Sequence, residues 1–300
     1  MKIAISGATG LIGAGLSAYL QMQKHDIHPL VRQWPLHSAR QIFWNPDKGE
    51  IDHTGLEGMD AVIHLAGENL AGRWTPRKKE QIMESRRVGT RLVAAALARL
   101  QRPPAVFISA SATGFYGDRG EEVLDESSAG GSGFLAEVCA AWESAAEPAR
   151  QAGIRVLHSR FGIILDPSGG ALGRLLPLLR GGVGGKLGGG RQYWSWVTMT
   201  DVHRALAFLI ETPGVSGPVN VTAPAPVTNA EFTRIAAHTL HRPVLFNVPA
   251  FALRLALGEM AQEMLLSSAR VLPARLTSAG FHFHHPDLAS ALPAVLDRRR

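Results

Sequence analysis

The sequence predicts an α/β protein built on a doubly wound parallel sheet, followed by a smaller C-terminal α/β region. Apolar strand-like runs alternate with helical spacing over the first half of the chain, the order that produces a parallel sheet covered by helices on both faces. The first run ends in three evenly spaced glycines before a helix. The chain has 300 residues, 46% of them hydrophobic, enough for one large domain or two smaller ones.

The first thirteen residues predict a dinucleotide site. Ile3 and Ile5 lie in a short apolar run expected to be a buried strand, and helical spacing begins just after it. Glycines let a phosphate approach the backbone closely, and the free N–H groups and dipole of a helix start attract the anion. The alternative is a tight turn that holds no ligand. The residues predicted to contact the cofactor here are Gly7, Thr9, Gly10, Leu11, Ile12 and Gly13.

The second predicted strand, Ile27–Arg32, ends in a basic residue. A carboxylate at this position would bind the ribose 2′-hydroxyl of NAD, whereas an arginine accommodates the 2′-phosphate of NADP. Arg32 therefore favours NADP over NAD, the alternative being an exposed arginine at a strand end.

A third strand is expected in the run Asp60–Gly67, which ends in small residues that allow the backbone to approach a cofactor. His64 within it is expected to be packed or capping, not catalytic. Thr75 and Pro76 open a long predicted helix that runs to Leu100. The next strand is expected at Ala105–Ser109.

The remaining predicted elements first continue the alternation of strands and helices, and after residue 160 the composition becomes rich in glycine. A helix is expected over Gly133–Gln151 and a strand over Ile154–Arg160. Glycine pairs between Gly169 and Gly190 then flank one predicted helix, and they indicate either loops that fold over a ligand or surface turns. The last predicted elements are a helix Val202–Glu211 capped by Thr200–Asp201, a strand Val219–Val221, a helix Asn229–Leu240 and helical segments from Pro249.

These patterns predict two parts, a cofactor-binding domain over 1–160 and a substrate-side region over 161–300 with a distinct helical segment from about 247. One cysteine, Cys139, excludes a disulfide scaffold and suits a reducing cytosol. We see no N-terminal signal peptide and no apolar run of about 18 residues, so we expect a cytoplasmic protein without a membrane partner.

The chain is basic, with a formal net charge of +6. Its arginines are scattered apart from three at the C-terminus, and no nucleic-acid-binding motif accompanies them. We therefore expect a small-molecule substrate and no nucleic acid as partner. The sequence leaves the oligomeric state open.

Several segments together carry a family resemblance. They are Gly7–Gly13, Leu65–Asn69, Arg73–Thr75, Ser85–Arg86, Ser109–Gly117, Gly169–Gly173, Gly188–Trp196 and Val227–Phe232. Over essentially the whole chain, the sequence resembles the extended and atypical short-chain dehydrogenase/reductases. The closest resemblance is to nucleoside-diphosphate-sugar-epimerase-like oxidoreductases, also labelled cell-division inhibitors. The resemblance implies a Rossmann fold and NADP(H) held by Gly7–Gly13, Arg32, Leu65–Ala66–Gly67 and Arg86, with Gly162 near the nicotinamide.

The resemblance also implies a catalytic serine and a tyrosine–lysine pair, and here the chain departs from the pattern. Ser111 matches the serine, which would position a substrate oxygen. Phe134 and Val138 stand where the tyrosine and lysine belong, and none of the three tyrosines is followed by lysine four residues later.

Candidate substitutes for the missing acid–base pair are Tyr116, Tyr193, Glu137 and Cys139. Each has a plainer structural alternative. Tyr116 could pack in a loop, Tyr193 could form part of an aromatic substrate wall, Glu137 could lie on the solvated helix surface, and Cys139 could belong to the core. Ser111 and Tyr116 are the catalytic residues predicted. The function expected is an NADP(H)-dependent oxidoreductase or epimerase-like enzyme acting on a small polar substrate. The alternative is a non-catalytic NADP(H)-binding sensor or assembly protein.

Overall fold

An eight-stranded sheet forms the centre of the computed structural model, which describes residues 1–33, 38–244 and 246–297. The order is β13-β8-β6-β5-β1-β2-β3-β4, and every pairing is parallel except β3 with β4. The strands are β1 (Lys2–Ser6), β2 (Asp26–Val31), β3 (Ile42–Asn45), β4 (Glu50–Ile51), β5 (Ala61–His64), β6 (Val106–Ala112), β8 (Arg155–Phe161) and β13 (Gly217–Val221). The predicted α/β fold class is confirmed.

Helices cover both faces of this sheet because successive strand residues point to opposite sides. Ile3 and Ile5 pack on the face of α1 (Leu11–Met22) and α7 (Met199–Glu211), with Leu16 and Leu206. Ala4 packs on the other face, with Val93 and other side chains from the opposite helix layer. That layer consists of α3 (Pro76–Leu97), α4 (Phe134–Ser144) and α5 (Glu147–Gln151).

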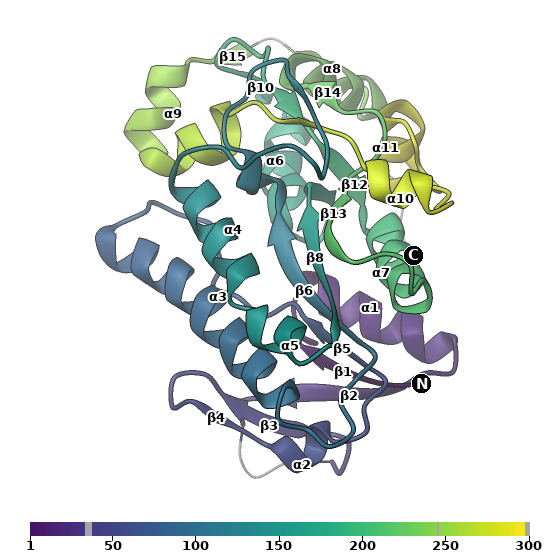
Figure 1. Ribbon diagram of the computed structural model, residues 1–300. Coiled ribbons are helices and arrows are strands. Elements are labelled where there is room, and N and C mark those ends of the chain that lie inside the picture. The colour runs from purple at the N-terminus through teal and green to yellow at the C-terminus, as the bar shows by residue number, and fades with distance from the viewer. Residues whose placement is uncertain (34–37, 245, 298–300) are drawn as a thin grey trace.

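The later part of the chain builds a second core at one end of the sheet (Figure 1). Its helical elements are α6 (Gly170–Arg180), α8 (Asn229–Thr239), α9 (Ala250–Leu257), the π-helical turn η2 (Ala261–Leu266), α10 (Ala274–Ser278) and α11 (Leu288–Leu296). Short strand pairs connect them: β9 (Ile163–Leu165) with β12 (Trp196–Thr198), β10 (Gly185–Leu187) with β15 (Phe246–Val248), β11 (Tyr193–Trp194) with β14 (Val227–Thr228), and β16 (Arg270–Val271) with β7 (Val123–Leu124). The remaining short helices are α2 (His53–Leu56) and the 3-10 turn η1 (Thr113–Tyr116).

β13 and α7 return from this later part to the central sheet, where β13 pairs with β8 and α7 packs on α1. The domain boundary near residue 160 stays a prediction.

Two predicted elements differ from those observed. The single helix over Gly133–Gln151 is two helices, α4 and α5, and Pro148 in the first turn of α5 lacks the N–H that a continuous helix would need. The helix α7 begins at Met199, and its N-cap is Thr198, whose hydroxyl oxygen accepts the Asp201 N–H at 3.2 Å. The predicted cap, Thr200–Asp201, lies inside the first turn. Buried Asp201 instead accepts the N–H groups of residues 284 and 285 and anchors that part of the chain.

Candidate functional site

The carboxyl ends of the parallel strands share one edge of the sheet, which is where ligands bind in open α/β sheets. Gly7 follows β1, Leu65 follows β5, and Gly162 follows β8 at this edge, while Ser111 lies near the end of β6. The topology therefore gathers residues from four segments far apart in the sequence.

The glycine turn adopts a backbone that larger residues would not permit. Gly7 has φ +69°, and a Cβ there would lie 2.9 Å from the Ala66 nitrogen. A Cβ on Gly13 would lie 2.1 Å from the Gly7 carbonyl oxygen. Gly10 is the N-cap of α1, and no side chain caps that helix. The first N–H groups of α1 consequently lack intrahelical partners, as the cofactor prediction requires.

Arg86 lies beside this edge on α3 and is buried, with 7% of its surface exposed. Its Nη1 donates to the Ile82 carbonyl oxygen at 3.1 Å, and its guanidinium lies 4.8 Å from the Trp142 ring centre. A Cβ on Gly67 would lie 3.4 Å from the guanidinium carbon. Within the described chain this cation has no carboxylate salt-bridge partner, and burial lowers its pKa. A buried cation with spare donors fits an anionic ligand such as a phosphate.

Arg32 directly follows β2 and is exposed. No ion pair holds it within the part of the chain that the structure describes, so its guanidinium is accessible. Gly162 has a different neighbourhood: a Cβ there would lie 2.5 Å from the Ser195 carbonyl oxygen. Close packing of backbone against backbone is thus sufficient to require glycine at this position.

The start of α6 packs over the glycine turn. A Cβ on Gly169 would lie 2.9 Å from the Leu11 Cδ1 atom, and one on Gly170 would lie 3.3 Å from Leu11 Cδ2. Gly169, the N-cap of α6, has no side-chain capping bond. The glycine-rich stretch therefore borders the predicted cofactor edge, with the uncapped starts of α1 and α6 close together.

Ser111 and Tyr116 belong to one buried hydrogen-bond network. The Ser111 hydroxyl donates to Glu143 Oε1 at 2.8 Å, and the same oxygen accepts from Arg160 Nε at 2.7 Å. Arg160 Nη1 donates to the Tyr116 hydroxyl at 3.0 Å, and that hydroxyl shares its hydrogen between the carbonyl oxygen of Asp125 (2.9 Å) and Oδ1 of Asn220 (2.8 Å). Every hydroxyl hydrogen in the network is committed inside the protein.

This network changes what the two predicted catalytic residues can do. Tyr116 is fully buried, and burial raises its pKa, so its environment matches the packing alternative. Ser111 is 2% exposed, and its hydroxyl donates to a carboxylate. In this arrangement the Ser111 oxygen can accept a hydrogen bond, but donating to a substrate carbonyl would require breaking the bond to Glu143.

The start of α4, where the tyrosine–lysine pair would stand, is apolar. Phe134 and Val138 are buried in a cluster with Trp74, Ile82 and Met260. The cluster joins the two helices α3 and α4 to the C-terminal segment.

A carboxylate from the C-terminal segment reaches the same helix start, and the sequence prediction missed it. Glu263 Oε2 accepts the Leu135 N–H at 3.1 Å, and a Cβ on Gly133 would lie 2.5 Å from Glu263 Oε1. An ion pair between Lys79 and Glu259, at 2.8 Å, also connects α3 to this segment. Leu135 and Glu263 are 128 residues apart, so no local sequence pattern could predict their contact.

The other substitutes for the acid–base pair differ in accessibility. Cys139 is buried, and burial raises its pKa to about 11, so the thiolate is disfavoured at neutral pH. Glu137 is exposed on α4. Tyr193 is half-buried with the Arg270 guanidinium 4.9 Å from its ring centre.

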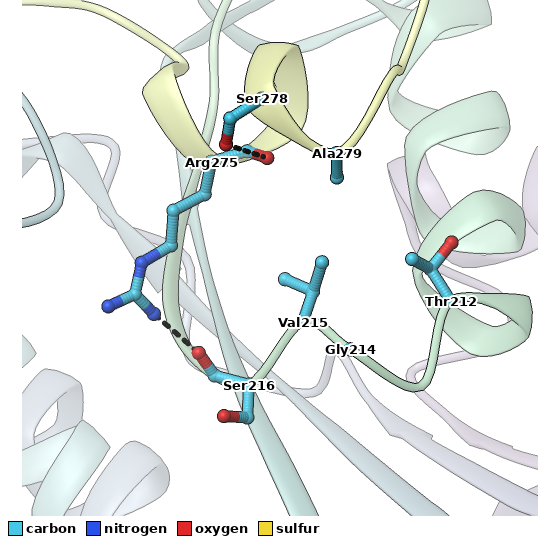
Figure 2. Close-up of a pocket in the computed structure, with 7 residues that line it drawn as sticks. All are labelled: Thr212, Gly214, Val215, Ser216, Arg275, Ser278 and Ala279. Carbon is cyan, nitrogen blue, oxygen red and sulfur yellow. Dashed lines mark hydrogen bonds between the residues drawn. The ribbon is translucent and has the colours of Figure 1, made fainter.

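A separate hollow of about 510 Å³ lies away from the cofactor edge, beside the amino end of β13 (Figure 2). Thr212, Val215, Ser216, Arg275 and Ser278 are among its lining residues. It contains none of the predicted site residues. Among the described residues, no group of three or more metal-ligating side chains is gathered, and no helix is long and apolar enough to cross a membrane.

Comparisons with known proteins cover almost the whole chain. Residues 3–222 match the NAD dependent epimerase/dehydratase family, and residues 248–295 match a domain of unknown function, DUF1731. The chain is 45% identical to Epimerase family protein Mb2239 of Mycobacterium bovis over 97% of this chain and 96% of that one. It is 34% identical to YfhF of Bacillus subtilis over 100% and 99%.

Solved structures of similar proteins have the same fold. The human epimerase family protein SDR39U1 (isoform 2), solved with NADPH, superposes with a TM-score of 0.91 at 29% identity, covering 99% of this chain and 100% of that chain. The UDP-N-acetylglucosamine 4-epimerase of Bacillus cereus, at 15% identity and a TM-score of 0.75 over 98% of each chain, shares the fold. From the family match and the relatives together, the chain belongs to the epimerase-like short-chain dehydrogenase/reductases of the NAD dependent epimerase/dehydratase family.

Proposed function

We propose that this protein binds NADP(H) at the carboxyl edge of its sheet and acts as an oxidoreductase or epimerase-like enzyme on a small polar substrate. The observation that carries the proposal is the glycine turn of Gly7–Gly13, which leads into the uncapped start of α1. The NADPH of the human relative supports the choice of cofactor. When bound, NADP(H) supplies hydride transfer.

The protein's own residues would hold this cofactor in three places. The N–H groups at Leu11, Ile12 and Gly13 would face the pyrophosphate, with Thr9 beside them. Arg32 would pair with the 2′-phosphate, which NAD lacks. Buried Arg86 would contribute a cation beside Leu65–Ala66–Gly67. Gly162, which directly follows β8, would lie near the nicotinamide.

The proposal extends to organisation and partners. Residues 1–160 would form the cofactor-binding part and 161–300 the substrate side, with the glycine-rich stretch that packs on Leu11 closing over the ligand. A cytoplasmic location and a small-molecule substrate, without nucleic acid, fit a single buried cysteine and scattered arginines.

A second candidate function is a non-catalytic NADP(H)-binding sensor or assembly protein. The observation that favours it is the region of Ser111, Tyr116, Phe134 and Val138, where hydroxyl hydrogens are committed to internal partners and the helix start is apolar. Both candidate functions require NADP(H), but only the first predicts that the protein converts a substrate.

Thermal unfolding with NADPH and NADH tests the shared part. At about 100 times its Kd a ligand adds roughly 2.7 kcal/mol to stability, which for a chain of this size raises the melting temperature by about 4 °C. We expect this shift with NADPH, a smaller one with NADH, and loss of the difference in Arg32→Ala. Equal shifts in the wild type would refute the preference for NADP, and no shift with either would refute cofactor binding.

A further inference from the structure

A buried histidine adjoins the cofactor edge, and the proposed function does not use it. His64 is the last residue of β5 and is completely buried. Its Nδ1 lies 2.6 Å from the hydroxyl oxygen of Ser6, the last residue of β1, which is also buried. Ser6 immediately precedes the glycine turn.

The Ser6 hydroxyl connects this histidine to the opposite wall of the site. Its oxygen lies 3.2 Å from the Leu65 nitrogen and 3.4 Å from the Ala66 nitrogen, both of which donate to it. The Leu65 N–H is shared with the Ser6 carbonyl oxygen, also at 3.2 Å. Two donors occupy the oxygen's lone pairs, so its hydrogen must point elsewhere. Nδ1 of His64 lies in position to receive it, which assigns the imidazole hydrogen to Nε2, a buried atom without a hydrogen-bond partner among the described residues.

The Ser6–His64 hydrogen bond adjoins the point where the backbones of Gly7 and Ala66 come closest to each other. A Cβ on Gly7 would lie 2.9 Å from the Ala66 nitrogen, so the glycine turn and the residues after β5 already lie at the closest approach that glycine allows. The Ser6 hydroxyl therefore lies between the two backbone segments that flank the proposed pyrophosphate site.

The described residues that contact or pair with His64 are uncharged. Trp44 from β3 meets it edge-on with ring centres 5.6 Å apart, and a Cβ on Gly89 of α3 would lie 3.6 Å from Nε2. Ser109 of β6 is its register partner. Burial lowers the pKa of His64 to about 4, and no charged group contributes to the shift. The imidazole consequently stays neutral, and an acceptor at Nδ1, over the physiological range.

We propose that His64 is a positioning residue for the cofactor site: by accepting the Ser6 hydrogen it holds Ser6 as the acceptor for Leu65 and Ala66, and so holds these residues against the glycine turn. The inference rests on the proposed binding of NADP(H). It assigns His64 no contact with substrate or cofactor.

The experiment compares two substitutions of nearly equal shape. Asn Oδ1 takes the place of Nδ1 and still accepts from Ser6, whereas Leu has the same size and no acceptor. Fluorescence titration with NADPH should show His64→Leu binding about tenfold more weakly than the wild type, the equivalent of one lost hydrogen bond. His64→Asn should stay within about twofold. Equal affinities of the two variants would overturn the proposal.

A double-substitution cycle separates positioning through Ser6 from a general packing effect. In a Ser6→Ala background, His64→Leu should cause almost no further loss of NADPH affinity, because the route through Ser6 is already gone. Independent, additive losses would contradict the proposal.

Amide hydrogen exchange without cofactor provides a readout that does not depend on the proposed function. Exchange at Ala66, whose N–H donates to the Ser6 hydroxyl, should be faster in His64→Leu and in Ser6→Ala, and unchanged in His64→Asn. Leu65 serves as the internal reference, because its N–H also donates to the Ser6 carbonyl oxygen. If the wild type failed to bind NADPH, the cofactor proposal would fall, while the exchange data would still decide whether His64 orders this segment. Unchanged exchange in His64→Leu would overturn the inference by itself.

Discussion

The glycine turn at Gly7–Gly13 and the start of α4 at Phe134–Val138 lie in the same fold but have opposite chemical characters. At the turn, glycines keep side chains away and leave helix N–H groups open. At α4, apolar side chains fill the space and a glutamate from the C-terminal segment accepts a helix N–H. The comparison contrasts a turn that leaves space beside open N–H groups with a helix start filled by packing, so the proposed cofactor binding and the acid–base chemistry can be tested by separate substitutions.

The largest effect should come from placing a lysine where the family's pair would have one. Val138 is 2% exposed and lies among apolar side chains. The substitution Val138→Lys would bury an unpaired ammonium and should lower the free energy of unfolding by about 4 kcal/mol or more. The neighbouring substitution Glu137→Lys, on the exposed face of the same helix, should cost about 1 kcal/mol or less, because it places a positive charge in the first turn of α4. Urea unfolding measures both, and a stable Val138→Lys protein would show that this helix start is not a packed core.

Lowering the pH should reduce the free energy of unfolding, because buried histidines take up protons only in the unfolded chain. His64 has an ordinary pKa of 6.5 when unfolded and about 4 when folded. Between these values the unfolded chain binds a proton that the folded chain excludes, so the stability contribution is complete above pH 6.5 and falls towards pH 4, by about 3 kcal/mol in total. His158, whose pKa burial also lowers, adds to the same trend.

Urea unfolding between pH 7 and pH 4.5 measures this dependence. The variant His64→Asn, which has no titrating group at this position, should show a shallower slope. Identical slopes in the variant and the wild type would rule out His64 as the source.

The glycine turn should respond to a single methyl group. In Gly13→Ala the new Cβ would lie 2.1 Å from a backbone oxygen, so the turn must shift. We expect a loss of about 1–3 kcal/mol in stability and no thermal shift with NADPH. Gly189→Ala is the control because nothing lies within 4 Å of its Cβ position. If Gly13→Ala kept the NADPH shift of the wild type, the turn would not be the binding element.

Local patterns predicted the first strand, the glycine turn and the first helix well because their determinants are adjacent in sequence. A strand, three glycines and a helix identify β1 and α1 without knowledge of the rest of the chain. The network around Ser111 is different: Glu143 and Arg160 are 17 residues apart, and their pairing depends on how α4 lies against β8. The Glu263 contact spans 128 residues and could not be inferred from spacing at all. Short strands of two or three residues, such as β11 and β16, also lack enough length for a periodic signal.

The central claim is that the protein binds NADP(H) but lacks the acid–base pair that turns over sugar nucleotides. Positioned acid–base catalysis is worth about 10²–10⁴-fold in rate. The most direct measurement is nuclear magnetic resonance of UDP-galactose incubated with the purified wild type saturated with the oxidised cofactor NADP+, which can accept the hydride that epimerisation removes. We predict that the cofactor stays bound and that UDP-glucose forms very slowly or not at all. Rapid conversion, with many turnovers per molecule within minutes, would contradict the claim and show that another residue has taken over proton transfer.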